Sequence, residues 1–382
     1  MNETKQRQAV APDMDILKKI LGGAARENAS DLFFIKDMPL SFKVNGAILT
    51  RGERLLTEYD TESLVRAMYQ LGDNRDFSIL EEKMDDDFAF SLDDMRFRVN
   101  TFVQKGAYCA VLRMLSAKIP DPKRMHIPQK IIDYANLKNG LILITGETGS
   151  GKSTTQACLI DYINTNLNKH IITLEDPVEY THQKKKSLVT QREMFTDSEG
   201  FPTALKAALR QCPDVILVGE MRDPETIETA MSAAETGHLV ISTLHTMDAA
   251  NAVGRIIDAF PKDQSAYIAT LLSGVLKCVV FQQLIKGTDG KLIPLFEILD
   301  VTDPVRGLIQ DGNPKAIRNF MDQNPKQRYT TLDCMLIRLF AEGRIDEATV
   351  YNYGNSSKKE WLDTQIGMVK RGIAPDYTQI PL

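Results

Sequence analysis

The sequence predicts an α/β protein built from two domains, and three observations lead to this conclusion. The chain has 382 residues, which is more than one ordinary domain holds. In its second half, four short apolar runs alternate with helical stretches, and this pattern is typical of a parallel sheet covered on both faces. A segment with three prolines separates that half from an N-terminal region of alternating strands.

The N-terminal region, residues 1–117, is expected to form a small α+β domain. Residues 1–12 are polar and should be loose, and a helix should follow, capped by Asp13 or Asp15. The expected elements after it are strands in DLFFI and SFKV, a hairpin turn at Asn45-Gly46, a helical stretch over 60–83, and strands over 86–91, 95–103 and 107–115.

The second domain begins after the connector, residues 118–128, which its prolines should keep stiff and non-helical. Over 129–302 the runs LILIT, HIITL, DVILV and HLVIST are expected to be the strands of the parallel sheet. Over 303–382 the chain should be helical, with helices around 304–311, 331–342 and 346–353 and a loose tail.

Composition argues against several classes of protein. Hydrophobic residues make up 43% and charged residues 25%, as in a globular domain, and the net charge of −5 disfavours a nucleic-acid partner. The five cysteines form no C-x-x-C, so neither a zinc site nor a disulfide framework is expected. The polar N-terminus is unlike a signal peptide and no apolar run is long enough to span a membrane, so we expect a cytoplasmic protein.

A phosphate-binding loop follows the first strand of the second domain. The run from Gly146 to Ser153 fits G-x-x-x-x-G-K-[ST] between a strand and a helical stretch, which is the context that this motif requires. Lys152 should reach the β- and γ-phosphates of ATP, and Ser153 should supply a hydroxyl to Mg²⁺. The candidate nucleotide-binding residues are Gly146, Glu147, Thr148, Gly149, Ser150, Gly151, Lys152, Ser153 and Thr154.

Hydrolysis also requires a carboxylate that orients water and helps to hold the metal. The apolar run DVILV ends in Gly219-Glu220, where an acidic pair is usual, so Glu220 is one candidate and a second acidic residue should assist it. LEDPVEY offers Glu175, Asp176 and Glu179 after another strand. The candidate magnesium ligands are Ser153, Glu220 and one of these three carboxylates, of which we favour Glu179.

Two histidines flank the strand HLVISTL. His245 ends the strand, where it could sense the γ-phosphate. His238 opens the strand, and an ordinary hydrogen-bonded surface histidine is the alternative for it.

Four blocks, GETGSGKST, LEDPVEY, LVGEMRD and TGHLVISTLHT, resemble the Walker A, Asp box, Walker B and His box of the type II/IV secretion ATPase superfamily. The pilus retraction ATPases are the most similar branch, and the likeness covers roughly residues 13–355. It implies a PAS-like N-terminal domain, a RecA-like ATPase core and a homo-hexameric ring. It further implies catalytic roles for Glu179, Glu220, His238 and His245, and for Arg98 and Arg113 acting across a subunit interface. The implied partners are an inner-membrane pilus platform protein and a paralogous retraction ATPase.

The stretch Ala316-Ile317-Arg318-Asn319 resembles the AIRN motif that is linked to retraction in that branch. An ordinary amphipathic helix is the alternative interpretation of this stretch. We expect Arg318 to lie on an exposed face and to add little to stability. Three alternatives stay open: a pilus or secretion assembly ATPase, a nucleic-acid motor, and a non-catalytic ring partner. The assembly ATPases commonly carry a further N-terminal domain and a four-cysteine zinc motif, so the missing C-x-x-C favours retraction.

Overall fold

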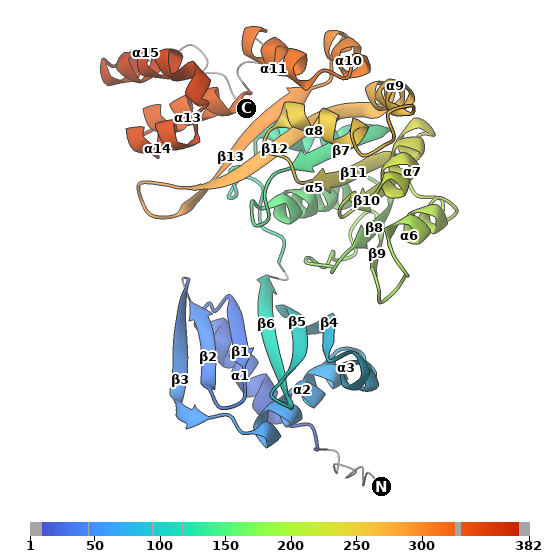
Figure 1. Ribbon diagram of the computed structural model, residues 1–382, viewed down its shortest axis with the longest axis vertical. Helices are drawn as coiled ribbons and strands as arrows, with labels where there is room; N and C mark the ends of the chain where they lie inside the picture. Colours follow the sequence, from blue (N-terminus) through green and yellow to red (C-terminus); the bar gives the residue numbers. More distant parts are fainter. Residues whose placement is uncertain (1–9, 45, 94, 117, 325–329, 374–382) are drawn as a thin grey trace. The chain divides into compact units, whose positions relative to one another are not determined.

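The structure is a computed structural model that describes residues 10–44, 46–93, 95–116, 118–324 and 330–373 (Figure 1). It contains two separate sheets, each with its own helices, and this confirms the α/β class. The described chain divides into two compact units. The N-terminal unit holds the described residues up to Lys118 together with Pro177–Thr181, and the second unit holds the remainder.

The described residues of the N-terminal unit form a six-stranded antiparallel sheet with three helices. Its strand order is β3-β2-β1-β6-β5-β4. The elements are α1 (Met14–Arg26), β1 (Asp31–Phe34), β2 (Pro39–Val44), β3 (Ala47–Leu55), α2 (Glu58–Leu71), α3 (Ser78–Lys83), β4 (Asp85–Leu92), β5 (Met95–Gln104) and β6 (Ala107–Ser116). The three strands predicted over 86–115 are confirmed, as is the α+β character of this region.

Local sequence explains where these helices begin and end. The Asp13 side chain accepts a hydrogen bond from the Ile16 N–H at 3.0 Å, so Asp13, and not Asp15, caps α1. The single helical stretch expected over 60–83 is wrong, because α2 stops at Leu71. A side chain at Gly72 would lie 2.9 Å from the Phe88 ring, and the next two residues have positive φ, which ends the helix. Asn45 of the expected hairpin turn lies outside the described residues.

The second unit contains a seven-stranded sheet of order β13-β12-β7-β11-β10-β8-β9. All neighbouring strands from β12 to β9 run parallel, and β13 joins antiparallel to β12, so the predicted parallel sheet is confirmed with one antiparallel edge strand. The elements are α4 (Gln129–Asp133), η1 (Tyr134–Asn136), β7 (Gly140–Thr145), α5 (Lys152–Asn166), β8 (His170–Glu175), β9 (Leu188–Glu193), α6 (Phe201–Ala208), β10 (Val215–Val218), α7 (Pro224–Glu235), β11 (Leu239–Leu244), α8 (Ala249–Ile257), α9 (Ser265–Val275), β12 (Leu276–Lys286) and β13 (Leu292–Asp300).

Both faces of this sheet are buried, which is why its strands are continuously apolar. Every residue of β7, β10 and β11 is buried. One face packs against α4 and α5 and the other against α6 to α9. Because helices cover both faces of the sheet, polar groups can gather only at the ends of its strands.

The C-terminal region is helical, as expected. Its elements are α10 (Asp303–Gln310), α11 (Pro314–Gln323), α13 (Leu332–Ala341), α14 (Glu347–Tyr353), η2 (Ser356–Lys358) and α15 (Lys359–Lys370). The last three helices pack with Ile285, Ile293 and Leu295 of the β12–β13 hairpin in a core of their own. The expected loose tail after residue 373 lies outside the described residues.

Arg318 on α11 differs from the expectation of an exposed helix charge. Its side chain is 23% exposed and forms a two-pronged ion pair with Glu297 of β13, at 2.8 Å and 2.7 Å, while Glu297 is 1% exposed. The same carboxylate accepts the backbone N–H groups of Ala249 and Leu332, both at 3.1 Å. Glu297 therefore joins α8, α11 and α13 to the sheet, and Arg318 belongs to the framework of the unit.

The five cysteines are all free thiols. Four are buried, and Cys212 is exposed just before β10. Within the described residues, no helix combines the length and the apolar character that crossing a bilayer requires.

Candidate nucleotide site

The parallel register brings four predicted segments to one edge of the sheet. Thr145 of β7 pairs with Leu244 of β11, and Val218 of β10 pairs with both Ser242 and Leu174. The carboxyl ends of these strands therefore lie side by side. The residues that follow or end them are Gly146, His245, Gly219-Glu220 and Glu175. This is the edge at which open α/β sheets bind ligands.

The loop from Gly146 to Gly151 turns from β7 into α5 with positive φ at three glycines. The φ angles are 142° at Gly146, 82° at Gly149 and 89° at Gly151. A side chain at Gly146 would lie 2.1 Å from the backbone oxygen of Gln282 on the neighbouring strand, so no other residue fits there. The loop leads into the amino end of α5, where unpaired N–H groups and the helix dipole favour phosphate.

Lys152 is held over this loop by the loop's own carbonyl groups. Its Nζ donates to the oxygen of Gly146 at 2.9 Å and to that of Glu147 at 2.8 Å. The ammonium group therefore lies where phosphate oxygens would replace these carbonyls as partners. The Ser150 hydroxyl is buried and finds no hydrogen-bond partner within the described part of the chain, so it is available to an incoming group. Ser153 and Thr154 are half-buried on the first turn of α5.

The glycine in the Walker B segment has a steric reason. A side chain at Gly219 would lie 3.1 Å from the backbone oxygen of Leu174 and 3.4 Å from the Cα of Glu175, so the β8 backbone would have to shift slightly to accept one. Glu220 follows with its side chain 17% exposed and paired to the Nε of Arg222 at 2.7 Å. Glu220 is thus the carboxylate that β10 presents at this edge.

His245 lies beside Glu220 and the phosphate-binding loop. Its Nε2 is 3.9 Å from a Glu220 carboxylate oxygen. Burial lowers the pKa of His245, and the charges of Lys152 and Arg222 lower it further, against opposition from Glu220 and a backbone contact with Gly146. The imidazole is therefore neutral at pH 7, and it can donate or accept one hydrogen bond without adding charge.

Of the LEDPVEY carboxylates, Glu175 has defined partners in the second unit. Its Oε1 accepts from the Thr173 hydroxyl at 2.7 Å and from Gln191 Nε2 at 3.2 Å. Glu179 lies in Pro177–Thr181, which groups with the N-terminal unit. In that unit the Arg96 Nε donates to the Val178 oxygen at 2.5 Å. The role of Glu179 in hydrolysis and metal binding stays a prediction.

The structure does not bring His238 to this edge. His238 directly precedes β11, whose six residues span about 20 Å, so it lies at the opposite end of the strand from His245. Its Nδ1 donates to the Ala233 oxygen at 2.9 Å near the end of α7. The catalytic role of His238 that the family resemblance implies stays a prediction.

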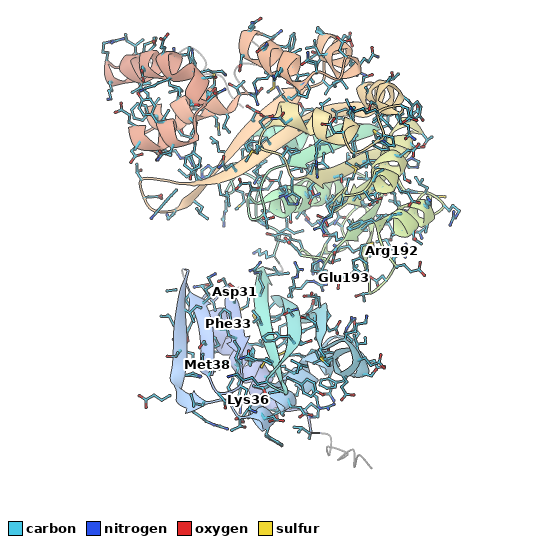
Figure 2. The ribbon with its side chains drawn as sticks, in the orientation of Figure 1. Asp31, Phe33, Lys36, Met38, Arg192 and Glu193 are labelled. Atoms are coloured by element: carbon cyan, nitrogen blue, oxygen red, sulfur yellow. The ribbon has the colours of Figure 1, made fainter. Side chains whose placement is uncertain are left out.

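Arg98 and Arg113 are directly opposite each other on the paired strands β5 and β6 of the N-terminal unit. Arg113 is 64% exposed, and its Nε donates to Asp31 Oδ1 at 3.0 Å. Figure 2 labels Asp31 on β1, the strand beside β6. The two arginines are close enough to act together, and their action on a nucleotide of another subunit stays a prediction.

Two residues at this edge were not found from the sequence. Arg222 pairs with Glu220, and Gln282 of β12 lies against the phosphate-binding loop. The signal for Gln282 is the pair Gln282-Gln283 inside the otherwise apolar run CVVFQQLI, because a polar side chain in a fully covered strand needs a partner.

Comparison with known proteins places the chain in a family. The family described as "Type II/IV secretion system protein" matches residues 6–364. The chain belongs to this family. Among its relatives, the type IV pilus retraction ATPase PilT of Pseudomonas aeruginosa is 38% identical over 333 residues, which cover 87% of this chain and 96% of PilT. The type IV pilus ATPase PilU of the same organism is 36% identical over 352 residues, covering 92% and 91%.

A solved structure of a family member supports the same assignment. The crystal structure of the pilus retraction motor PilT with bound ADP superposes with a TM-score of 0.83 at 38% identity, covering 91% of this chain and 99% of that one. The resemblance to the PilT and PilU branch that the four motif blocks predicted is therefore confirmed.

Proposed function

We propose that this protein is a motor ATPase that hydrolyses ATP to ADP and phosphate and thereby drives retraction of a type IV pilus, as in twitching motility. One observation carries the proposal: the phosphate-binding loop, Glu220 and His245 lie together at one sheet edge. They do so in a chain that is 38% identical over 87% of its length to a retraction ATPase. The motif and the geometry both support a phosphate site, and the relatives suggest that this site hydrolyses ATP for pilus retraction.

The chain's own groups can perform each part of the hydrolysis. Lys152 would leave the carbonyl oxygens of Gly146 and Glu147 and pair with phosphate oxygens, which stabilises the charge that develops there. Glu220 would orient the attacking water by accepting its hydrogen bond. Neutral His245 would contact the γ-phosphate only when it is present, and so could distinguish ATP from ADP.

The oxygen donors at this edge suit Mg²⁺, because the Ser153 hydroxyl and the Glu220 carboxylate are hard ligands. Ser153 and Glu220 would hold Mg²⁺ at this edge, and the positive charge of the metal would offset the charge of the phosphates. Glu179 remains a proposed third ligand. The Arg222 side chain paired with Glu220 would have to turn away for the carboxylate to serve the metal or the water.

The assembly follows from the same proposal. We assign residues 1–117 as a PAS-like domain, 118–128 as a hinge, 129–302 as a RecA-like core and 303–382 as a helical extension. In a homo-hexameric ring, Arg98 and Arg113 would complete the site of a neighbouring subunit. The ring would work at the cytoplasmic face of the inner membrane on a pilus platform protein, with a paralogous retraction ATPase as a further partner.

The test pairs a purified enzyme with a cell. Lys152→Ala should lose ATPase activity while keeping its fold, and Lys138→Ala, which removes an exposed lysine at the other end of β7, should keep both. A strain that carries only Lys152→Ala should show surplus pili and no twitching. Bald cells would indicate pilus assembly instead, and wild-type turnover by Lys152→Ala would refute the ATPase assignment itself.

A further inference from the structure

Gln282 touches the phosphate-binding loop from a strand that does not lead into it. β12 lies beside β7, and the pairing of Phe281 with Thr145 places Gln282 level with Gly146. Gln282 is 4% exposed, although its strand neighbours are almost all apolar. A buried amide in such a place must have a partner to offset the loss of water.

Three contacts define what this glutamine does. Its backbone oxygen lies 2.1 Å from the position that a side chain at Gly146 would take, so the strand passes directly against the start of the loop. Its Nε2 lies 2.8 Å from the corresponding position at Gly151, at the end of the loop. Its Oε1 accepts the hydroxyl hydrogen of Thr155 at 2.7 Å, and Thr155 is fully buried in the first turn of α5.

These contacts span the whole loop. Gln282 thus packs against the first and the last glycine of the loop and is hydrogen-bonded to the helix that begins with Lys152. The loop's positive-φ glycines give it little stiffness of its own, so a neighbouring strand must limit the shapes it can take. The hydrogen bond to Thr155 also sets how α5, and with it the phosphate-facing N–H groups, sits against β12.

We propose that Gln282 is a positioning residue that holds the phosphate-binding loop in the shape that receives the β-phosphate. The inference rests on the proposed ATPase function and deepens it, because it adds a residue outside the four motif blocks to the same site. Gln282 has no role in bond breaking. Its contribution is to keep the loop and the amino end of α5 in register before a nucleotide arrives.

The experiment measures binding of ADP and AMP to the full chain without magnesium, by displacement of a fluorescent ADP. Gln282→Met keeps the length and apolar volume of the side chain and removes the strong acceptor, and Thr155→Val removes the donor. Each should weaken ADP binding about tenfold, the effect of one buried hydrogen bond, and AMP binding less than twofold, because AMP has no β-phosphate. Gln283→Met, on the same strand with its side chain on the other face, is the matched control and should bind both nucleotides like wild type.

The double variant supplies the second arm. If both changes break the same hydrogen bond, the second change should add little to the first. The double variant, Gln282→Met with Thr155→Val, should then have a Kd for ADP within about twofold of that of either single variant. The positioning role would be overturned if the single variants lost ADP and AMP binding equally. It would also be overturned if the losses of ADP binding in the two single variants added fully in the double variant. Thr155→Val carries the comparison if Gln282→Met does not fold. Wild-type chain that binds no ADP would overturn the proposed function, whereas wild-type binding with unchanged Gln282→Met and Thr155→Val would overturn this inference alone.

Discussion

Replacing Arg318 by alanine should destabilise the C-terminal part of the second unit. The change removes both prongs of the ion pair from the Glu297 carboxylate, which is 1% exposed in the wild-type chain. Burial alone would raise the pKa of Glu297, but the hydrogen bonds and charge of Arg318, with two backbone N–H groups, hold that pKa below its usual value. The wild-type carboxylate is therefore ionised, and the variant must either bury that charge poorly or protonate it.

The expected loss of folding stability depends on the hydrogen bonds that Glu297 retains in the variant. Removing one partner of a buried ion pair usually destabilises by about 3–5 kcal/mol. Glu297 retains the N–H groups of Ala249 and Leu332, so we expect the low end, ~3 kcal/mol. With a urea dependence of ~3 kcal/mol per molar, the unfolding midpoint should fall by about 1 M. The variant can protonate Glu297, so its deficit should shrink as the pH falls from 8 to 5.

The chain provides its own probe for this measurement. Its one tryptophan, Trp361, lies on α15 and packs against the core of α13 to α15. Urea unfolding followed by Trp361 fluorescence should shift in Arg318→Ala. The control, Lys315→Ala, removes an exposed positive charge from the same helix and should stay within ~0.5 kcal/mol of wild type. Equal midpoints for the two variants would refute the interpretation of α11 as part of the framework.

Four further outcomes are expected. Gly219→Ala should lower stability by roughly 1–3 kcal/mol, seen as a lower melting temperature, because its methyl group meets the β8 backbone; an unchanged melting temperature would show that β8 yields. Glu220→Gln should bind ATP like wild type and hydrolyse it at least ~100-fold more slowly, measured by phosphate release; loss of ATP binding would make Glu220 structural. Inactive Arg113→Ala and Lys152→Ala chains, once shown to co-assemble, should recover turnover when mixed, because some interfaces then hold both missing parts; no recovery argues against a shared site. Burial lowers the pKa of His182 to about 4, below its ordinary value near 6.5, so folding stability should be full above pH 6.5 and should fall by ~2–3 kcal/mol as the pH drops to 4. His182→Asn should lose that pH dependence in urea titrations, and an unaltered profile would assign it to other groups.

Local patterns were sufficient to predict much of the fold. The strands of the parallel sheet could be predicted because both of their faces are covered, which makes them short and wholly apolar. The break between α2 and α3 could not be predicted from the sequence, because the helix ends where Gly72 lies against Phe88, which is distant in sequence. A helical periodicity carries no information about such a contact.

Some residues of the candidate site could likewise be predicted from the sequence, and others could not. The phosphate-binding loop, Glu220 and His245 could be predicted because each directly follows a strand, and parallel strands end at one edge. Gln282 could not be predicted, because its partners come from β7 and α5, more than 100 positions earlier in the chain. Arg318 was misjudged for a related reason: a helical pattern shows which residues share a face but not that a buried glutamate lies against that face.

The uneven exposure of the cysteines has a practical consequence. Cys212 alone among the five is exposed, and it precedes β10, at the end of that strand away from Glu220. Burial raises the pKa of Cys109, Cys158 and Cys278, which keeps those thiols protonated and unreactive toward maleimides. The natural chain should therefore accept one dye per molecule without any mutation. A dye at Cys212 would sit clear of the nucleotide edge, so that labelled chains could be followed by fluorescence while they turn over ATP.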